Sequence, residues 1–207
     1  MFSLPRKELK SVGFNDQEIK KVIAFGEIVA SKFPKSPNTV DLCAGSGICA
    51  FFLLYNGLAD KVTLVDVRKP LKFLDFEELF RKRDFNFKYI TADIRKPEFS
   101  IEGISPKTNL ITSIHPCGYL ADSVIRLALQ SNSHLALMTC CHRVRSPKYD
   151  LENPPDPRLM LYEEPSDYYD LVRQRFIQEQ GWECDWKEIP RKITPRNHVL
   201  VASPRKI

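Results

Sequence analysis

Apolar residues recur at helical spacing near the start of the chain and then fall into short, separate runs. Val22, Phe25 and Val29 repeat every three or four positions behind Asn15, a residue type that caps helices, so we expect a helix over residues 16–33. The later runs are bounded by polar residues and separated by stretches long enough for crossover helices, which is typical of parallel strands. The predicted strands span residues 39–42, 61–66, 87–91, 109–114 and 134–139, and the helices between them span residues 47–56, 71–83 and 122–130.

Residues 143–165 break this pattern, because their five prolines cannot lie inside a helix or a central strand. We expect a long loop or lid there. A further helix over residues 166–180 ends at Gly181. Residues 182–189 and 198–202 then predict two strands whose short basic connection allows them to pair antiparallel.

Composition bounds the class of protein. The chain has 207 residues, 43% of them hydrophobic and 28% charged, which suits one domain with a buried core over residues 1–207. Within it we expect a cofactor half at about residues 37–100 and an acceptor half at about residues 108–207. No apolar run approaches the roughly 20 residues that span a bilayer, and the six cysteines lack extracellular spacing, so we expect a cytoplasmic protein with reduced thiols. A net charge of +5 permits a nucleic-acid partner.

A tight glycine turn follows the first predicted strand. Asp41 ends that strand, and Gly45 and Gly47 can adopt positive φ and leave no Cβ to block a ligand. Such a turn before a helix places backbone N–H groups at the carboxyl edge of the sheet. A dinucleotide site usually has a third glycine, which is Ala50 here, so the sequence predicts a cofactor without a pyrophosphate.

Two further acids end the next two strands. Asp66 lies where a carboxylate is expected to accept hydrogen bonds from ribose hydroxyls, and Asp93 follows the third strand, where it can meet an adenine amino group. An acid at the end of a strand is alternatively a helix cap or a solvated turn residue.

In order and spacing these motifs resemble the class I S-adenosylmethionine-dependent methyltransferases. The resemblance covers nearly the whole chain. It implies an α/β, Rossmann-like fold, with a mostly parallel seven-stranded sheet, helices on both faces and an antiparallel last strand. It also implies that S-adenosyl-L-methionine is the cofactor. The residues that would bind it are Asp41, Cys43, Ala44, Gly45, Gly47, Asp66, Val67, Asp93, Ile94 and His115.

The segment after the fourth strand should face the methyl acceptor in that fold. It reads His115-Pro116-Cys117-Gly118-Tyr119-Leu120-Ala121-Asp122 and is not the Asp/Asn-Pro-Pro-aromatic run of amino-methyltransferases. Together with Cys140-Cys141-His142, this His-x-Cys-Gly segment resembles the catalytic domain of tRNA acceptor-stem 2′-O-methyltransferases and related methyltransferase-like proteins. Those tRNA enzymes add Cys/His zinc modules that this chain lacks.

The candidate catalytic residues are His115, Cys117 and His142. His115 would act as a general base or orient the acceptor, because the pKa of histidine lies near working pH. Alternatively, it is a buried structural histidine that is hydrogen-bonded at the end of a strand. Cys117 is alternatively a small core residue, and Asp122 is expected to cap the next helix. A zinc site is an alternative, because five residues could converge on one edge of the sheet: His115, Cys117, Cys140, Cys141 and His142. No pair of them has the Cys-x2-Cys spacing of structural zinc, so we expect no metal site.

Basic residues near the C-terminus suggest how an acceptor would be held. Residues 187–207 contain six Lys and Arg residues and one acid, and this excess of positive charge favours contact with a phosphate backbone. The expected acceptor contacts are Tyr119, Arg143, Lys192 and Arg196. Three functions remain open: an RNA methyltransferase acting on a ribose 2′-hydroxyl of a tRNA-like substrate, a small-molecule or protein methyltransferase with a lid over the acceptor, and a non-catalytic cofactor-binding protein.

Overall fold

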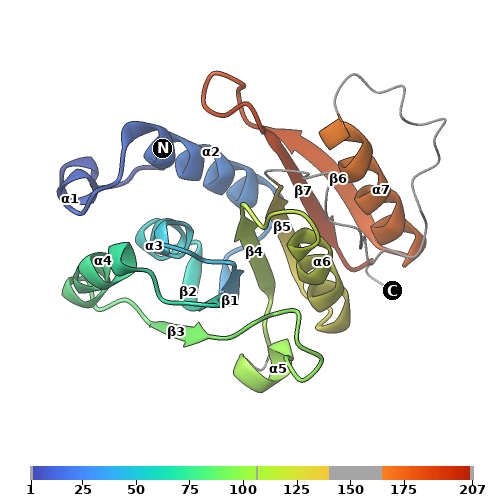
Figure 1. Ribbon diagram of the computed structural model, residues 1–207, viewed down its shortest axis with the longest axis horizontal. Coiled ribbons are helices and arrows are strands. Elements are labelled where there is room, and N and C mark those ends of the chain that lie inside the picture. The colour runs from blue at the N-terminus through green and yellow to red at the C-terminus, as the bar shows by residue number, and fades with distance from the viewer. Residues whose placement is uncertain (1, 106, 140–164, 206–207) are drawn as a thin grey trace.

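Seven strands form one sheet in the computed structural model, which describes residues 2–105, 107–139 and 165–205 (Figure 1). Their order in space is β3-β2-β1-β4-β5-β7-β6, and every neighbouring pair is parallel except those made by β7, which is antiparallel to β5 and β6. The predicted fold class is therefore confirmed. The strands are β1 (Ser36–Leu42), β2 (Ala59–Asp66), β3 (Phe87–Thr91), β4 (Leu110–Ile114), β5 (His134–Met138), β6 (Glu183–Glu188) and β7 (His198–Ser203).

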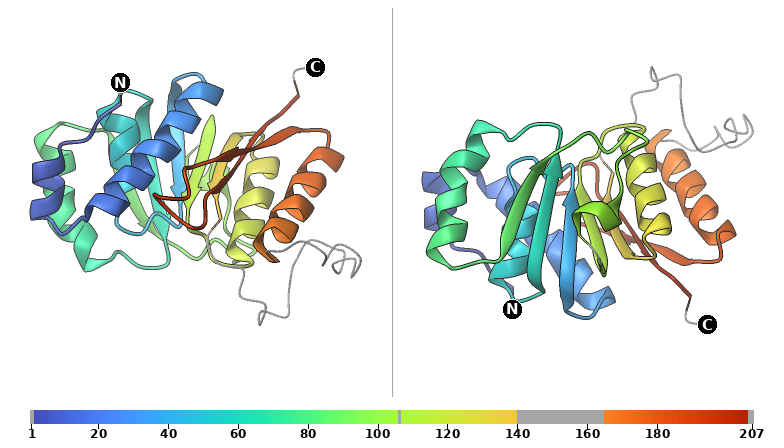
Figure 2. Two further views of the ribbon diagram at one scale, coloured as in Figure 1. Left: turned by 90° about the horizontal axis from the view of Figure 1, so that it is seen from above. Right: turned by 90° about the horizontal axis from the view of Figure 1, so that it is seen from below.

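Helices cover both faces of this sheet (Figure 2). On one face the apolar core joins the strands to α1 (Arg6–Ser11), α2 (Asp16–Lys32), α3 (Ile48–Tyr55) and α4 (Leu71–Lys82). On the other face it joins them to α5 (Ile101–Ile104), α6 (Leu120–Gln130) and α7 (Pro165–Glu179). None of the helices in the described ranges has the length and apolar character that a bilayer crossing requires.

Local sequence explains where the longer helices begin and end. Asn15 and Glu18 form a reciprocal capping box at the start of α2, in which each side chain accepts from the other residue's backbone N–H. Pro165, expected in the preceding loop, instead starts α7, a position where its missing N–H costs nothing. Gly181, with φ +82°, follows the end of α7 as predicted. The short helices α1 and α5 were not predicted, because six and four residues are too few to show a period.

Strand direction brings the functional segments to one edge. β1, β2, β4 and β5 are parallel, so their carboxyl ends meet there. Because β7 runs the opposite way and pairs Val199 with Met138, the connection between β6 and β7 lies at this same edge. In Figure 1 this connection is the loop at the upper end of β6 and β7, and it lies beside α2. The predicted cofactor turn, the predicted acceptor segment and the basic connection are therefore neighbours.

Candidate cofactor and acceptor site

The glycine turn (residues 43–47) follows β1 and contains two glycines with different structural roles. Both adopt the predicted positive φ, +50° at Gly45 and +76° at Gly47. A Cβ at Gly45 would meet nothing within 4 Å, so this backbone is open to a ligand. A Cβ at Gly47 would lie 2.8 Å from the Leu64 side chain and 2.9 Å from that of Phe73, so Gly47 allows α3 to pack against β2 and α4.

Asp41, on β1, is a buried acid whose two side-chain oxygens differ in their hydrogen bonding. The Thr112 hydroxyl donates to its Oδ1 at 2.8 Å, whereas Oδ2 has no hydrogen-bond partner within the described parts of the chain. Burial raises the pKa of Asp41 to about 7. Because a buried polar atom without a hydrogen-bond partner is costly, this oxygen fits a cofactor that brings a polar group into the pocket.

Asp66 ends β2 as predicted and is joined to the glycine turn. Its Oδ2 accepts a hydrogen bond from the Gly45 N–H at 2.9 Å, and the Tyr89 hydroxyl donates to the Gly45 carbonyl at 3.0 Å. Asp66 as a residue is partly exposed. These contacts fix the acid relative to the turn, which suits a ligand that touches both.

A pocket of about 310 Å³ opens between the glycine turn, the end of β4 and the first turns of α2. It brings together five of the predicted cofactor residues and adds three residues of α2 that were not predicted. The predicted members are Asp41, Cys43, Ala44, Gly45 and His115, and the new ones on α2 are Glu18, Lys21 and Val22. Nothing in the sequence singled out Lys21, because charged residues on an amphipathic helix are usually a solvated face.

The remaining predicted cofactor residues lie outside this lining; they are Gly47, Asp66, Val67, Asp93 and Ile94. Asp93 is held by Arg95, which donates through Nε at 2.7 Å and through its backbone N–H at 3.0 Å. Arg95 lowers the pKa of Asp93 to about 2 and also donates to the Tyr119 hydroxyl. Val67 is exposed and Ile94 is buried. An adenine amino group would therefore meet a carboxylate already engaged by Arg95.

His115 stands at the end of β4 in the left-handed region, with φ +67°. Its Nε2 lies 2.8 Å from Lys21 Nζ, and its Nδ1 is buried with no partner in the described structure. Burial first, and the nearby Lys21 charge second, lower the pKa of His115 to about 4. His115 is therefore neutral near pH 7, and its Nε2 accepts from the lysine. Like Cys43, at φ +55°, it is a strained residue lining the pocket.

The remaining expectations concern Asp122, Cys117, the lid segment and a metal site. Asp122 does not cap α6: it lies inside the first turn, completely buried, where Arg173 Nε donates to it at 2.8 Å. Cys117 is exposed, so the alternative of a small core residue is wrong. His142, Arg143 and the lid fall outside the described residues. Among the residues the structure describes, no three His, Cys, Asp or Glu side chains gather as a metal site would require.

The basic loop (residues 189–197) joins β6 to β7 and contains Lys192 and Arg196, both exposed. Gln17 Nε2 donates to the Ile193 carbonyl at 3.1 Å, which ties the loop to the start of α2. Within the loop, the Thr194 hydroxyl donates to the Arg196 carbonyl at 3.1 Å. The cations predicted to hold an acceptor therefore stand beside the helix that lines the pocket.

Comparisons with known proteins agree with this geometry. A family model described as a methyltransferase domain matches residues 16–146, more than half of the chain. A comparison with curated protein sequences finds no match.

Similar solved structures share the fold at low identity. An rRNA methylase from Streptococcus thermophilus is 13% identical with a TM-score of 0.56, covering 93% of this chain and 99% of that one. TYW2 of P. horikoshii, in complex with MeSAdo, is 17% identical with a TM-score of 0.55, covering 91% of this chain and 62% of that one. An S-adenosylmethionine-dependent methyltransferase from Aquifex aeolicus is 11% identical with a TM-score of 0.54, covering 97% and 98%.

Proposed function

Since the chain belongs to the methyltransferase domain family whose model matches residues 16–146, we propose that it methylates RNA, at a ribose 2′-hydroxyl of a tRNA-like acceptor. The protein is a methyltransferase that uses S-adenosylmethionine. The RNA acceptor and the modified atom are the proposal. The observation that carries it is the basic loop anchored beside the pocket.

The basic loop has the charge and position that a phosphate backbone needs. Arg191, Lys192 and Arg196 are exposed, and residues 189–197 contain no acid. The Gln17–Ile193 hydrogen bond holds them next to α2, whose Lys21 lines the pocket. Lys and Arg contacts to phosphates fix the register of a nucleic acid without reading its bases. An RNA held there would present its ribose to the pocket beside His115.

The cofactor residues support a pocket for S-adenosylmethionine. Gly45 leaves its backbone open, Asp41 Oδ2 is a buried polar atom with no partner in the described residues, and Asp66, a partly exposed residue, would accept from the ribose hydroxyls. When bound, S-adenosylmethionine supplies a methyl group carried by a positively charged sulfur. The protein's task is then to bring an acceptor oxygen into line with that methyl group.

In this proposal Lys21 and His115, which line the pocket and lie 2.8 Å apart, are the polar groups that would meet the acceptor. In the proposed reaction the acceptor hydroxyl gives its proton to solvent water as its oxygen bonds carbon, and a lysine ammonium aimed at that oxygen would stabilise the negative charge left by the proton. With its low pKa, neutral His115 is a weak base and is better suited to orienting Lys21 and the acceptor than to holding a proton. This favours the orienting role over the general-base role expected from the sequence.

A salt-dependence experiment tests the acceptor class. We expect tRNA binding to fall steeply between low and physiological salt. The Arg191→Ala/Lys192→Ala variant should lower the log–log salt slope by about 2, because it lacks two cations that would each neutralise one phosphate. The matched control is Lys61→Ala/Lys88→Ala, which removes the same charge from β2 and β3, far along the sheet from the basic loop. Equal changes of slope in the two variants, or no tRNA retention by the wild type, would contradict the proposal.

A further inference from the structure

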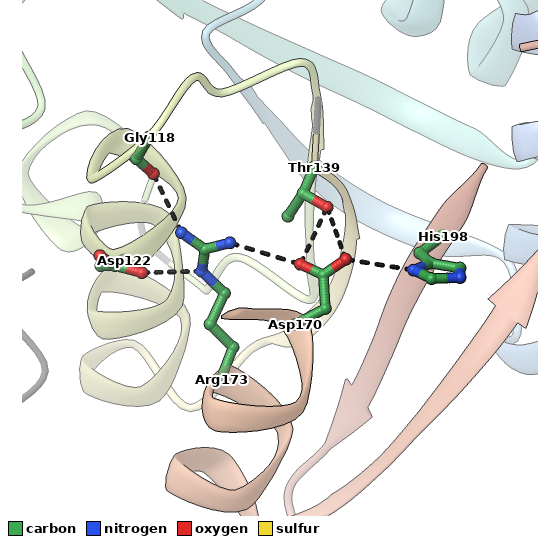
Figure 3. A network of polar contacts seen from close by, with 6 residues as sticks. All are labelled: Gly118, Asp122, Thr139, Asp170, Arg173 and His198. Carbon is green, nitrogen blue, oxygen red and sulfur yellow. Dashed lines mark hydrogen bonds and ion pairs between the residues drawn. The ribbon is translucent and has the colours of Figure 1, made fainter. Parts of the chain in front are cut away.

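A buried network of charged groups lies behind the acceptor edge, away from the pocket lining (Figure 3). Its centre is Arg173 on α7, whose side chain is 1% exposed. Arg173 Nε donates to Asp122 at 2.8 Å, Nη1 to Asp170 at 3.3 Å, and Nη2 to the Gly118 carbonyl at 3.1 Å. The three nitrogens of the guanidinium thus connect α7, the first turn of α6 and the loop before α6.

Asp170 extends the network to two more strands. Its carboxylate accepts from the Thr139 hydroxyl at 3.0 and 3.1 Å and lies 3.3 Å from His198 Nδ1. Thr139 directly follows β5, and His198 is the first residue of β7. Asp170 therefore holds the end of the strand that leads into Cys140 and the start of the strand that follows the basic loop.

The contact with Gly118 matters because the β4 loop (residues 115–119) has an unusual backbone. His115 and Gly118 both have positive φ, +67° and +59°. The Gly118 carbonyl accepts from Ala121 N–H at 3.2 Å as well as from Arg173. A strained loop keeps one conformation only when its surroundings determine it, and Arg173 binds the carbonyl of this loop from the α7 side.

Stability alone is a weak reason for such a network. Taking an arginine and two carboxylates out of water costs much of what their attraction returns, and well-packed apolar residues of similar size are often as stable. An arginine does, however, present several donors in a fixed plane, which sets the relative position of the groups it binds. The network therefore suits a role in geometry.

We propose that Arg173 is a positioning residue for methyl transfer: it holds the β4 loop and the end of β5 in the arrangement that lines the acceptor up with the methyl group. The proposal rests on the proposed function for its activity readout. Arg173 does not line the cofactor pocket, so it acts through Gly118, Asp122 and Asp170. Its loss should lower the rate of transfer and leave cofactor affinity unchanged.

The test compares Arg173→Lys with the wild type and with Ser133→Ala as control. Lysine keeps the charge but cannot hold Asp122, Asp170 and the Gly118 carbonyl together. Ser133 is equally buried and hydrogen-bonded to the Thr108 carbonyl, but it precedes β5 at the opposite edge of the sheet. The probes are S-adenosylmethionine carrying a labelled methyl group and total RNA, with rates divided by the amount of folded protein.

We expect Arg173→Lys to lower kcat about 10- to 100-fold, as a misplacement near 1 Å does, with cofactor Kd within about twofold of the wild type. Amide hydrogen exchange over residues 119–123 should become about tenfold faster, and that readout needs no acceptor. Ser133→Ala should change neither. Full kcat per folded molecule, or unchanged exchange in Arg173→Lys, overturns the proposal.

Two outcomes are kept apart by design. If the wild type moves no methyl group to RNA, the acceptor assignment fails, and hydrogen exchange alone decides whether Arg173 positions the loop. If Arg173→Lys does not fold, the neutral combination of Arg173→Met, Asp122→Asn and Asp170→Asn removes the unpaired charges and takes its place. The same lowered kcat and faster exchange are expected of it, and wild-type values would overturn the proposal.

Discussion

The glycine turn and the β4 loop stand on the same edge of the sheet but are held in different ways. The glycine turn is fixed by its own backbone, because two of its glycines adopt positive φ. It is also held by Asp66 at the end of β2, the next strand along the chain and the neighbour of β1 in the sheet. The β4 loop is fixed by a side chain 55 positions away, because Arg173 of α7 binds the Gly118 carbonyl. The first region is a local motif, and the second depends on the completed fold.

Because the two regions are held differently, substitutions in them should act on the protein in different ways. A change in the glycine turn acts on the cofactor pocket directly, by filling its space or removing an acceptor. A change in the network of Arg173, Asp122 and Asp170 acts first on the fold of the acceptor half and only through it on chemistry. Four sets of substitutions separate these two kinds of dependence.

The largest effect is expected for Arg173→Met alone. It leaves Asp122 and Asp170 as buried carboxylates without their cation, which should lower the free energy of unfolding by about 3–5 kcal/mol. Adding Asp122→Asn and Asp170→Asn should restore most of that stability, because the buried charges are gone. Urea unfolding measures both. If Arg173→Met costs less than about 1 kcal/mol, the network does not hold the acceptor half.

A pH-dependent effect is expected at Asp41 on the cofactor side. Burial raises the pKa of Asp41 from its ordinary 3.8 to about 7, so between these values the folded chain keeps a proton that the unfolded chain loses. The stability it contributes is full below pH 4 and is lost as pH rises through 7, by at most about 4 kcal/mol.

Asp41→Asn keeps an oxygen to accept from Thr112 and has no charge to bury. The variant should therefore lack this part of the pH dependence and be more stable than the wild type at pH 8. Urea unfolding of both proteins at pH 4.5, 6 and 8 measures the difference, since all other groups titrate alike in the two. If the free energies of unfolding of the two proteins change in parallel with pH, Asp41 is ionised in the folded protein throughout this range.

The two glycines of the turn offer a matched pair. Gly47→Ala adds left-handed strain and a Cβ pressed against Leu64 and Phe73, so it should lower the free energy of unfolding by about 2–4 kcal/mol. Gly45→Ala adds only the strain, about 1–2 kcal/mol, because the space around it is open. Thermal unfolding compares the two, and equal destabilisation would mean that packing at Gly47 is not what the turn requires.

The last substitution, Asp66→Ala, is expected to act on cofactor affinity. It removes an acceptor from the Gly45 N–H and from the proposed ribose contact, and hydrogen bonds to a charged group contribute about 1.5–3 kcal/mol. Cofactor affinity, measured by titration calorimetry, should fall about 10- to 100-fold while Arg173→Lys leaves it unchanged. Affinity within about twofold of the wild type would contradict the proposed ribose contact of Asp66.

Much of the fold and the cofactor side could be predicted from the sequence, because both depend on local rules. Strands and helices followed from apolar periodicity, and Gly45, Gly47 and Asp66 followed from what a turn at a strand's end requires. The positive φ of both glycines and the position of Asp66 at the end of β2 are confirmed.

The acceptor side could not be predicted in the same way. Lys21 lines the pocket because α2 crosses over the carboxyl edge, and no short-range pattern encodes that crossing. Asp122 was expected to cap α6 because an acid near a helix start usually does, but its partner, Arg173, lies 51 positions later. Only the three-residue spacing of Asp170 and Arg173 on α7 hinted at a pair, and it gave no sign that the pair is buried.

The most direct test of the proposed function is a transfer assay with labelled S-adenosylmethionine and total RNA, followed by nuclease digestion and separation of the nucleosides. We predict that the label appears in a 2′-O-methylated nucleoside, and that the Arg191→Ala/Lys192→Ala variant places less of it there. Label on a base would contradict the 2′-hydroxyl. Label in protein or small metabolites but not in RNA would contradict the RNA acceptor itself.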